Sequence, residues 1–277
     1  MLGYIDRYFF ALAPVWRIVI TSSFIAVIGF AAFRLKQLTV SGLIAAVVMG
    51  LVSMYLGGVS AITMYLFFLV SAAFIGKLSK RIRGLDKIQK KGGRRDAVQV
   101  LANGTAALAS IVLYRVTGDS IFLIVFSAAL GEAAADTWGG DIGVLSKDPP
   151  ISVITWMPVE RGLSGGISLL GCGASLLASA LYGIFCYSVF AESLSAAILV
   201  TASAFAGSLL DSVLGGSVQV HYEDEKTGRL TEIERDENGK ARRRVRGIRF
   251  FNNDAVNFTS NVFSALMALS VCLILGV

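Results

Sequence analysis

Three carboxylates close together in an apolar stretch have the clearest chemical potential in this chain. Glu132, Asp136 and Asp141 directly follow the apolar run 121–130, which has the composition of a membrane-spanning helix. A carboxylate at mid-bilayer costs roughly 2.5–3.5 kcal/mol on insertion scales, so three of them need a compensating partner. A divalent cation that also holds a nucleotide is such a partner. We therefore predict that Asp136 and Asp141, together with Glu132 and Asp211, bind Mg²⁺.

Helix geometry explains how these carboxylates would share one ion. Glu132 lies one turn before Asp136 on the same helical face. Asp141 follows two glycines, and we expect it beyond the helix end, where the chain can fold back toward the ion. Negative charge is unfavourable at a helix C-terminus, which favours a bound cation near Asp136 and Asp211. The alternative is neutralisation by a nearby basic side chain.

A basic segment with glycines could hold phosphate groups. Lys91, Arg94 and Arg95 flank or follow two glycines, and a guanidinium can grip a phosphate with two hydrogen bonds. Asp96 and Asn103 extend the segment into the next apolar stretch. Asp96 belongs either to the nucleotide site or only to the N-cap of the following helix. We predict a catalytic, phosphate-binding role for both arginines and a nucleotide-binding role for the other three residues.

A second glycine-rich segment precedes the sixth apolar stretch. Ser164, Gly165 and Gly166 would present backbone N–H groups to an anion if they lie at a helix N-terminus. Glycines also let transmembrane helices pack closely, which is the alternative explanation. We predict that this loop contacts the nucleotide.

Two amides and a carboxylate begin the last apolar stretch. Asn253, Asp254 and Asn257 lie within about one helical turn. They could order a metal ion or recognise a nucleotide base, or they could hydrogen-bond to a neighbouring helix. We predict that they complete the nucleotide or metal site.

Together these groups suit phosphoryl or nucleotidyl transfer, in which a metal ion and cationic side chains neutralise phosphate oxygens. The sequence has neither a histidine-based triad nor a Gly-x-Ser-x-Gly elbow, which disfavours acyl transfer through a serine nucleophile. His221 is the single histidine. Without a cysteine or second histidine nearby it is a poor metal ligand, and we expect an exposed strand residue.

The elements that must position these residues are membrane helices. The chain has 277 residues, of which 55% are hydrophobic and 16% are charged, and its mean hydropathy is +0.69. This composition predicts an all-α integral membrane protein that forms one polytopic domain, 1–277. Spans need about 20 apolar residues. We expect about eight of them, at 15–33, 38–56, 59–76, 97–116, 119–137, 166–188, 193–213 and 255–276.

The positive charges predict the orientation of these spans. If alternate connections face the cytoplasm, 22 of the 25 Lys and Arg residues lie on that side, as the positive-inside rule requires. Both termini are then outside, and all the polar clusters described above lie at cytoplasmic helix ends. We expect a multi-pass protein of the plasma membrane whose net charge of +6 contacts anionic lipids. No nucleic-acid partner is expected.

The largest polar insertion, 217–250, separates the seventh and eighth spans. Its alternating segments are divided by Thr-Gly and Asn-Gly turns, which predicts a small cytoplasmic β-meander. The insertion is too small for a core of its own, so we expect it to pack on the cytoplasmic face of the helices.

Five of these motifs resemble the signatures of the integral membrane family that includes plant phytyl-phosphate kinase, in the same order along the chain. A more distant likeness to dolichol kinases and CDP-diacylglycerol synthases rests on the segment around Asp136. The resemblance implies a CTP- or NTP-dependent kinase that converts a prenyl monophosphate to the diphosphate. The motifs are KGGRRDAVQVLANG at 91–104, ADTWGGDIG at 135–143, SGGIS at 164–168, GSLLDSVLG at 207–215 and NDAVN at 253–257.

We therefore expect a Mg²⁺-dependent lipid-phosphate kinase that uses CTP or another NTP and a phytyl- or geranylgeranyl-type monophosphate. Two alternatives stay open. One is a CTP-dependent cytidylyltransferase acting on a lipid phosphate. The other is an isoprenoid or small-anion transporter, in which the buried charges line a pathway. A homo-oligomer is compatible with the sequence.

Overall fold

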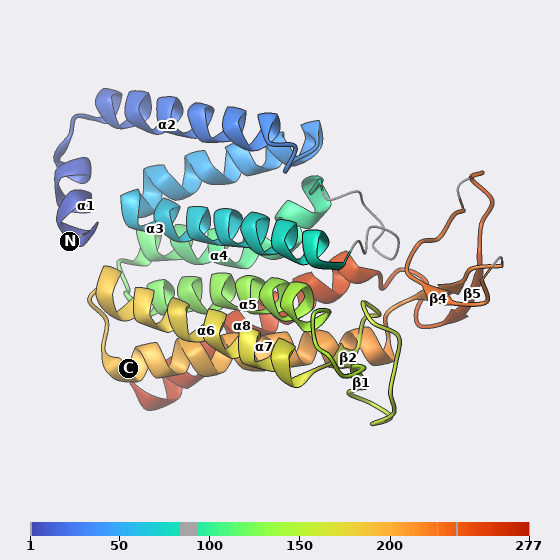
Figure 1. Ribbon diagram of the computed structural model, residues 1–277. Coiled ribbons are helices and arrows are strands. Elements are labelled where there is room, and N and C mark those ends of the chain that lie inside the picture. The colour runs from blue at the N-terminus through green and yellow to red at the C-terminus, as the bar shows by residue number, and fades with distance from the viewer. Residues whose placement is uncertain (1, 84–93, 226, 237, 277) are drawn as a thin grey trace.

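The computed structural model describes residues 2–83, 94–225, 227–236 and 238–276, and within them the chain is mainly helical (Figure 1). The helices are α1 (Leu2–Ala11), α2 (Pro14–Arg34), α3 (Val40–Arg83), α4 (Ala97–Thr117), α5 (Ile121–Gly143), α6 (Leu169–Val189), α7 (Leu194–Ser217) and α8 (Asn253–Leu275). In the described residues, seven of them, α2 to α8, are long and apolar enough to cross a membrane. The predicted all-α integral membrane fold is confirmed.

Helix α3 accounts for two of the eight predicted spans. Gly58 interrupts it with φ 77° and ψ −166°, a conformation that favours glycine, and the two halves run in opposite directions (Figure 1). Asp6 of α1 stabilises this turn. Its Oδ1 accepts the backbone N–H groups of Val59 at 2.6 Å and Ser60 at 3.2 Å, and so caps the second half.

Helix α5 lies at the centre of the bundle, in contact with α3, α4, α6, α7 and α8. Its alanines, including Ala129 and Ala133, are fully buried, because small side chains let neighbouring helices approach closely. Larger groups fill the remaining space, among them Phe126 and Tyr182, and the Tyr182 hydroxyl donates to the Met64 carbonyl at 3.0 Å. The carboxylates of α5 are therefore held on the most enclosed element of the fold.

Polar caps define where several helices begin. An Asp, Ser or Asn side chain accepts a backbone N–H of the first turn and satisfies a group that the helix itself leaves unpaired. These caps are Asp96 for α4, Ser168 for α6, Ser193 for α7 and Asn252 for α8.

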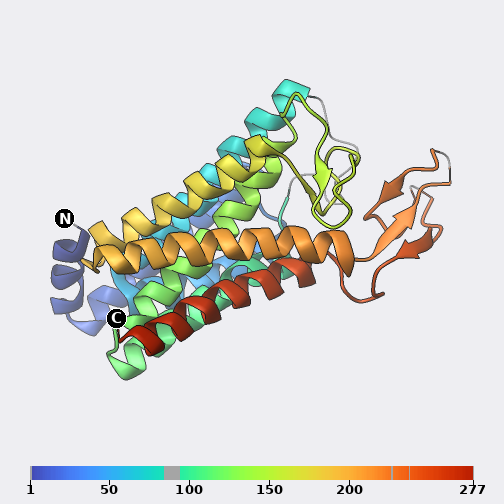
Figure 2. The same cartoon turned by 90° about the horizontal axis from the view of Figure 1, so that it is seen from below.

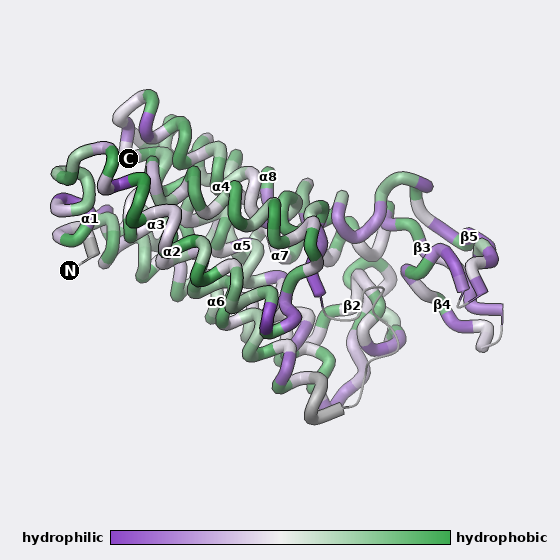
Figure 3. The backbone as a smooth tube through the Cα atoms, turned by 90° about the horizontal axis from the view of Figure 1, so that it is seen from above, coloured by the Kyte–Doolittle hydropathy of each residue, from purple (hydrophilic) through white to green (hydrophobic). Residues whose placement is uncertain are grey.

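The two ends of the bundle differ in character. Both termini lie at one end, and the short strands and the polar insertion lie at the other (Figures 1 and 2). Hydrophilic residues gather at the strand-bearing end (Figure 3). This arrangement agrees with the predicted alternation of the connections, and the positive-inside rule predicts that the strand-bearing end faces the cytoplasm.

The strands form two small antiparallel sheets. β1 (Ile151–Ser152) pairs with β2 (Gly166–Ile167) in the loop before α6. In the insertion, β3 (His221–Glu223) lies between β4 (Leu230–Thr231) and β5 (Arg243–Arg246). The insertion is thus a small sheet, as predicted, but its strand order β4-β3-β5 differs from that of a meander because β5 returns to pair with β3.

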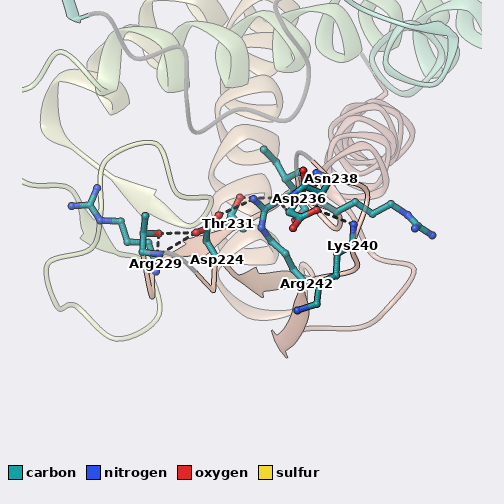
Figure 4. A network of polar contacts seen from close by, with 10 residues as sticks. Asp224, Arg229, Thr231, Asp236, Asn238, Lys240 and Arg242 are labelled. Carbon is teal, nitrogen blue, oxygen red and sulfur yellow. Dashed lines mark hydrogen bonds and ion pairs between the residues drawn. The ribbon is translucent and has the colours of Figure 1, made fainter.

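Polar contacts hold the insertion together (Figure 4). Arg242 forms an ion pair with Asp224 at 2.7 Å between Nη2 and Oδ2. Asp236 Oδ1 accepts the backbone N–H groups of Asn238 at 2.9 Å and Lys240 at 2.8 Å. An insertion too small for an apolar core is therefore organised by charges and turns.

The histidine of the insertion is not the exposed residue that we expected. His221 is fully buried, and its Nδ1 lies 2.9 Å from the Gln219 carbonyl oxygen. The tautomer with the proton on Nδ1 donates to that carbonyl and leaves Nε2 to accept from Arg246 Nη2 at 3.4 Å. Burial lowers the pKa of the His221 imidazole, and the Arg246 charge lowers it further.

Candidate active site

A polar cavity of about 360 Å³ lies at the strand-bearing end of the bundle. Its walls come from the start of α4, the C-terminal half of α5, the loop before α6, the end of α7, the insertion and the start of α8. Eleven of the fifteen predicted site residues line it. These are Arg95, Asn103, Asp136, Asp141, Ser164, Gly165, Gly166, Asp211, Asn253, Asp254 and Asn257.

Two carboxylates from different helices meet in this cavity. Asp136 of α5 and Asp211 of α7 lie within hydrogen-bonding reach of each other. Two carboxylates so close repel unless a proton or a cation lies between them. The pair therefore places two carboxylates side by side in the wall of the cavity.

Helix α8 supports the Asp211 side of this pair. Ser260 Oγ donates to Asp211 Oδ2 at 3.1 Å. The Asn257 amide, oriented so that its nitrogen faces acceptors, donates to the same oxygen at 3.2 Å and to the Asn253 carbonyl at 3.0 Å. Asn257 thus makes the contact to a neighbouring helix that was one of its two predicted roles, and the contact is to Asp211 of the pair.

Close packing of α5 against α6 fixes the position of Asp136. A Cβ atom at Gly139 would clash with Ser175 Oγ, and one at Gly171 would lie 2.9 Å from the Gly139 carbonyl oxygen. Ser175 Oγ also donates to the Ala135 carbonyl at 2.8 Å. Larger side chains at these glycines would separate the helices and move the carboxylate away from Asp211.

Asp141 has a different position from the one we expected. Helix α5 continues to Gly143, so Asp141 belongs to the helix instead of folding back from beyond its end. It faces α3, where a Cβ atom at Gly76 would lie 3.2 Å from Asp141 Oδ2. Burial lowers the pKa of Arg95, and the Asp141 carboxylate opposes that shift. The negative charge of Asp141 therefore stabilises the positive charge of Arg95.

Glu132 lies behind the cavity. It is 1% exposed, its Oε2 accepts from Asn261 Nδ2 at 2.8 Å, and its Oε1 has no hydrogen-bond partner. Within the described residues, no three His, Cys, Asp or Glu side chains form a group that could hold a metal ion. The four predicted ligands are thus the pair Asp136 and Asp211, with Asp141 farther along α5 near Arg95 and Glu132 one turn before Asp136, deeper in the bundle.

The predicted phosphate-binding segment divides into distinct roles. Arg95 lines the cavity and its guanidinium stacks on the Phe68 ring, 5.0 Å from the ring centroid. Arg94 is exposed and lies outside the cavity lining. Asp96 caps α4 by accepting the Gln99 N–H at 3.1 Å, the structural alternative that the sequence left open. Lys91 lies outside the described residues.

The glycine-rich loop does not lie at a helix N-terminus, and some of the donors that we predicted for an anion are occupied. Helix α6 begins only at Leu169, and Gly166 belongs to β2. The Gly166 N–H donates to the Leu163 carbonyl at 3.2 Å. Glu232 of the insertion accepts both the Ser164 N–H, at 3.3 Å, and the Ser164 hydroxyl. A carboxylate of the protein therefore takes the donors that we predicted for a nucleotide.

Several cavity residues were absent from the predictions. Gln219 is 1% exposed, its Nε2 donates to Ser164 Oγ at 3.1 Å and its Oε1 has no partner. Gln99 and Glu232 also line the cavity. No spacing rule links the insertion to the loop before α6, so only the tertiary structure identifies Glu232 and Gln219. Gln99 was identifiable, because it completes a capping box with Asp96.

The cavity has the donors that Mg²⁺ and a nucleotide require. Mg²⁺ takes oxygen ligands and is held by one or two carboxylates, with phosphate oxygens and water in the other positions. Asp136 and Asp211 fit that pattern as a pair whose mutual repulsion a cation would relieve. The amides of Asn253 and Gln219 offer hydrogen-bonding groups for other parts of a nucleotide.

Comparisons with known proteins place the chain among integral membrane proteins. The sequence profile of the family described as "Integral membrane protein DUF92" matches residues 23–265. No solved structure matches the chain.

The chain is similar to three curated proteins over most of its length. It is 26% identical to Protein PGR of Arabidopsis thaliana, over 92% of this chain and 96% of that protein. It is 30% identical to an uncharacterised membrane protein of Methanocaldococcus jannaschii, over 72% and 82% of the two chains. It is 24% identical to the chloroplastic protein VTE6 of Arabidopsis thaliana, over 93% and 72%.

Proposed function

Because the chain belongs to the family of integral membrane proteins described as DUF92, we propose that it is a lipid-phosphate kinase. The acceptor is a prenyl monophosphate of the phytyl or geranylgeranyl type, and the donor is CTP or another nucleoside triphosphate. The five sequence motifs that resemble those of the family including plant phytyl-phosphate kinase support a kinase-like role, and the similarity to VTE6 extends over 93% of the chain. The acceptor and the nucleotide are what that resemblance implies, and the Mg²⁺ is our inference from the carboxylates of the site.

One observation carries the proposal: the Asp136–Asp211 pair lies in a polar cavity that also contains Arg95. Phosphoryl transfer requires mainly positioning and the neutralisation of phosphate charge, so a site of this type needs no nucleophilic side chain. Mg²⁺ held by the pair would neutralise oxygens of the nucleotide phosphates. Arg95 provides a fixed positive charge for a phosphate group.

The reaction balances without a general base. An oxygen of the acceptor phosphate, already anionic at neutral pH, forms a bond to the γ-phosphorus of the nucleotide. The bond from that phosphorus to its bridging oxygen breaks, and the electron pair leaves with the nucleoside diphosphate. Asp136 and Asp211 would hold the Mg²⁺ that positions the donor phosphates, and Arg95 orients the acceptor oxygen toward the donor.

We place this site on the cytoplasmic side of the plasma membrane, where nucleotides are available. This placement rests on the positive-inside rule, since nearly all Lys and Arg residues belong to the connections at the strand-bearing end. The same charges favour anionic lipid headgroups near the entrance.

The decisive test incubates purified protein with Mg²⁺, prenyl phosphates of several lengths, and CTP or ATP labelled at the γ-phosphate. We expect the label in a prenyl diphosphate and release of a nucleoside diphosphate. Release of pyrophosphate with a nucleotide-linked lipid would instead establish the cytidylyltransferase. Substrate flux into liposomes without nucleotide turnover would establish the transporter. Asp136→Asn is the matched negative control for turnover.

A further inference from the structure

A second cavity, of about 110 Å³ and apolar, lies between α2, α3 and α4. It shares Arg95, Gln99 and Asn103 with the polar cavity, so the two spaces meet at the start of α4. The loop residues Ser164 and Gly166 and the insertion residue Gln219 line only the polar cavity. The two spaces therefore differ in chemistry and share one boundary.

The apolar cavity extends away from Arg95 along the second half of α3. Its wall on that helix runs from Leu69 to Ile62, which corresponds to about 10 Å of helix. The polar group on this wall, the Tyr65 hydroxyl, already donates to the Gly104 carbonyl at 3.0 Å. The cavity thus offers an elongated hydrocarbon-like surface with a cation at one end.

We propose that this apolar cavity binds the first units of the isoprenoid chain of the acceptor lipid, next to the lipid phosphate at Arg95. The inference rests on the proposed function and extends it by separating acceptor from donor. Arg95 is the only Lys, Arg or His among the described residues that line either cavity. A single-chain lipid with an anionic headgroup matches an apolar cavity that ends at one cation. The nucleotide then occupies the part of the polar cavity near Asp211 and α8.

Arg95 has the surroundings that an acceptor-binding cation requires. Its guanidinium stacks on Phe68, which lines the apolar cavity, and this contact orients the guanidinium at the junction. Its backbone is held as well, since Arg95 N donates to the Gln37 carbonyl at 2.9 Å and the Thr39 N–H donates to the Arg95 carbonyl at 3.0 Å. The cation is thus fixed between the end of α2 and the start of α3.

Three glycines set the width of the apolar cavity. A Cβ atom at Gly50 would lie 3.0 Å from Ile25 Cδ1, and one at Gly29 would lie 3.1 Å from Val47 Cγ2. A Cβ atom at Gly104 would clash with Met49 Cε, and Met49 lines the cavity. Small changes at these positions should therefore alter the space for the lipid chain without breaking polar contacts.

The first test maps the chain without relying on catalysis. The full-length protein in nanodiscs is irradiated with a geranylgeranyl phosphate analogue that carries a diazirine within the two isoprene units next to the phosphate, with no nucleotide present. We expect labelled peptides from α2, α3 and α4. Unlabelled geranylgeranyl phosphate should reduce the labelling, and dioleoyl phosphatidic acid should not. Labelling confined to other helices, or equal protection by phosphatidic acid, would overturn the proposal.

The second test changes the cavity volume. Ala46 lines the cavity, and Val48, on the same helix, is 53% exposed. We expect Ala46→Phe to lower kcat/KM for geranylgeranyl phosphate at least tenfold and to leave isopentenyl phosphate unaffected. Val48→Phe adds bulk outside the cavity and should behave like the parent. Gly104→Ala, which also favours helix, should cause a smaller loss in the same direction.

The two tests separate this inference from the proposed function. If the parent transfers phosphate but Ala46→Phe leaves kcat/KM for the long acceptor unchanged, the chain site is wrong and the kinase activity stands. If the parent transfers no phosphate to any acceptor, the kinase activity is wrong. Labelling of α2 to α4 that Ala46→Phe abolishes would then still establish the lipid site.

Discussion

At the level of single residues, the four carboxylates that we predicted as metal ligands have three different environments. Asp136 and Asp211 meet in the cavity, Asp141 faces α3 near Arg95, and Glu132 is held by Asn261 inside the bundle. Periodicity predicted a common helix face for Glu132 and Asp136 alone, and the packing of the helices determines what each carboxylate contacts. Their substitutions should therefore have different consequences.

Asp136→Asn should abolish activity and preserve the fold. The change keeps the size of the side chain and removes a charge that positions the donor phosphates, so we expect a loss on the order of 10²–10³-fold or more in kcat. Turnover and thermal unfolding in detergent measure the two effects. Asp148→Asn, in the exposed loop after α5, is the control and should match the parent. Near-normal turnover of a folded Asp136→Asn variant would remove this residue from the site.

Two neighbouring arginines allow a direct comparison of charge and geometry. Arg95→Lys keeps the charge but loses the planar fork and its stacking on Phe68, so we expect at least a tenfold fall in kcat/KM for the lipid phosphate. Arg94→Lys should behave like the parent, since Arg94 is exposed outside the cavity. Equal activity of all three proteins would show that the arginines serve only membrane orientation.

At the scale of elements, the polar insertion contributes to the site that the helices build. Its Glu232 takes the donors of Ser164, and its Gln219 contacts the same serine. The insertion is stabilised by its own ion pairs and turns, so it can present these side chains without a core of its own (Figure 4). The cavity is therefore completed by a segment far from α5 in sequence.

Glu232→Ala should strengthen nucleotide binding. The substitution removes a negative charge and releases the Ser164 N–H and hydroxyl for a phosphate oxygen. A contribution of about 1 kcal/mol, typical of a partly exposed charge, corresponds to roughly a fivefold lower KM for the nucleotide. Steady-state kinetics measure this, with Glu234→Ala, an exposed neighbour in the insertion, as control. A raised KM would show that Glu232 supports the loop instead of competing with the nucleotide.

The insertion should lose stability in mild acid. Burial lowers the pKa of His221 in the folded state. The imidazole is therefore protonated at a higher pH in the unfolded state than in the folded state, and protonation favours unfolding. The stabilisation that comes from keeping His221 neutral in the folded state is complete above the unfolded pKa of about 6.5. It is lost as the pH falls through that value toward the lowered folded pKa. Proteolysis within 221–246 should accelerate between pH 7.5 and 5.5, relative to cleavage of an unstructured peptide. His221→Gln should remove the pH dependence of proteolysis. If the proteolysis rate of the parent protein does not change with pH, the prediction is wrong.

At the scale of the whole molecule, the chain is a helical bundle with its charges at one end. The termini lie at the other end, and α5 passes through the centre (Figure 1). A membrane protein of this kind can bring a nucleotide and a lipid together only where the polar end meets the bilayer. Arg95, just before α4 at the strand-bearing end, has the position that our proposal requires.

Labelling of single cysteines should establish the orientation. In a background with Cys172, Cys186 and Cys272 replaced, Gly239→Cys should resist a membrane-impermeant maleimide in intact cells and react after lysis. A cysteine added to either terminus should react in intact cells. If position 239 is labelled in intact cells and the termini are protected, the predicted orientation is wrong and the cavity lies on the extracellular side of the membrane.

Hydropathy and helix-end polarity are local properties, so the amino-acid sequence was enough to predict the membrane class, the approximate spans and eleven of the residues that line the polar cavity. The tertiary structure decided the rest. It pairs Asp136 with Asp211, places Asp141 beside Arg95, buries His221, and brings Glu232 to Ser164. It also forms the apolar cavity between α2 and α4. The physical reason is that these contacts join segments far apart in the chain, so their partners depend on helix rotation and packing, which no local pattern specifies.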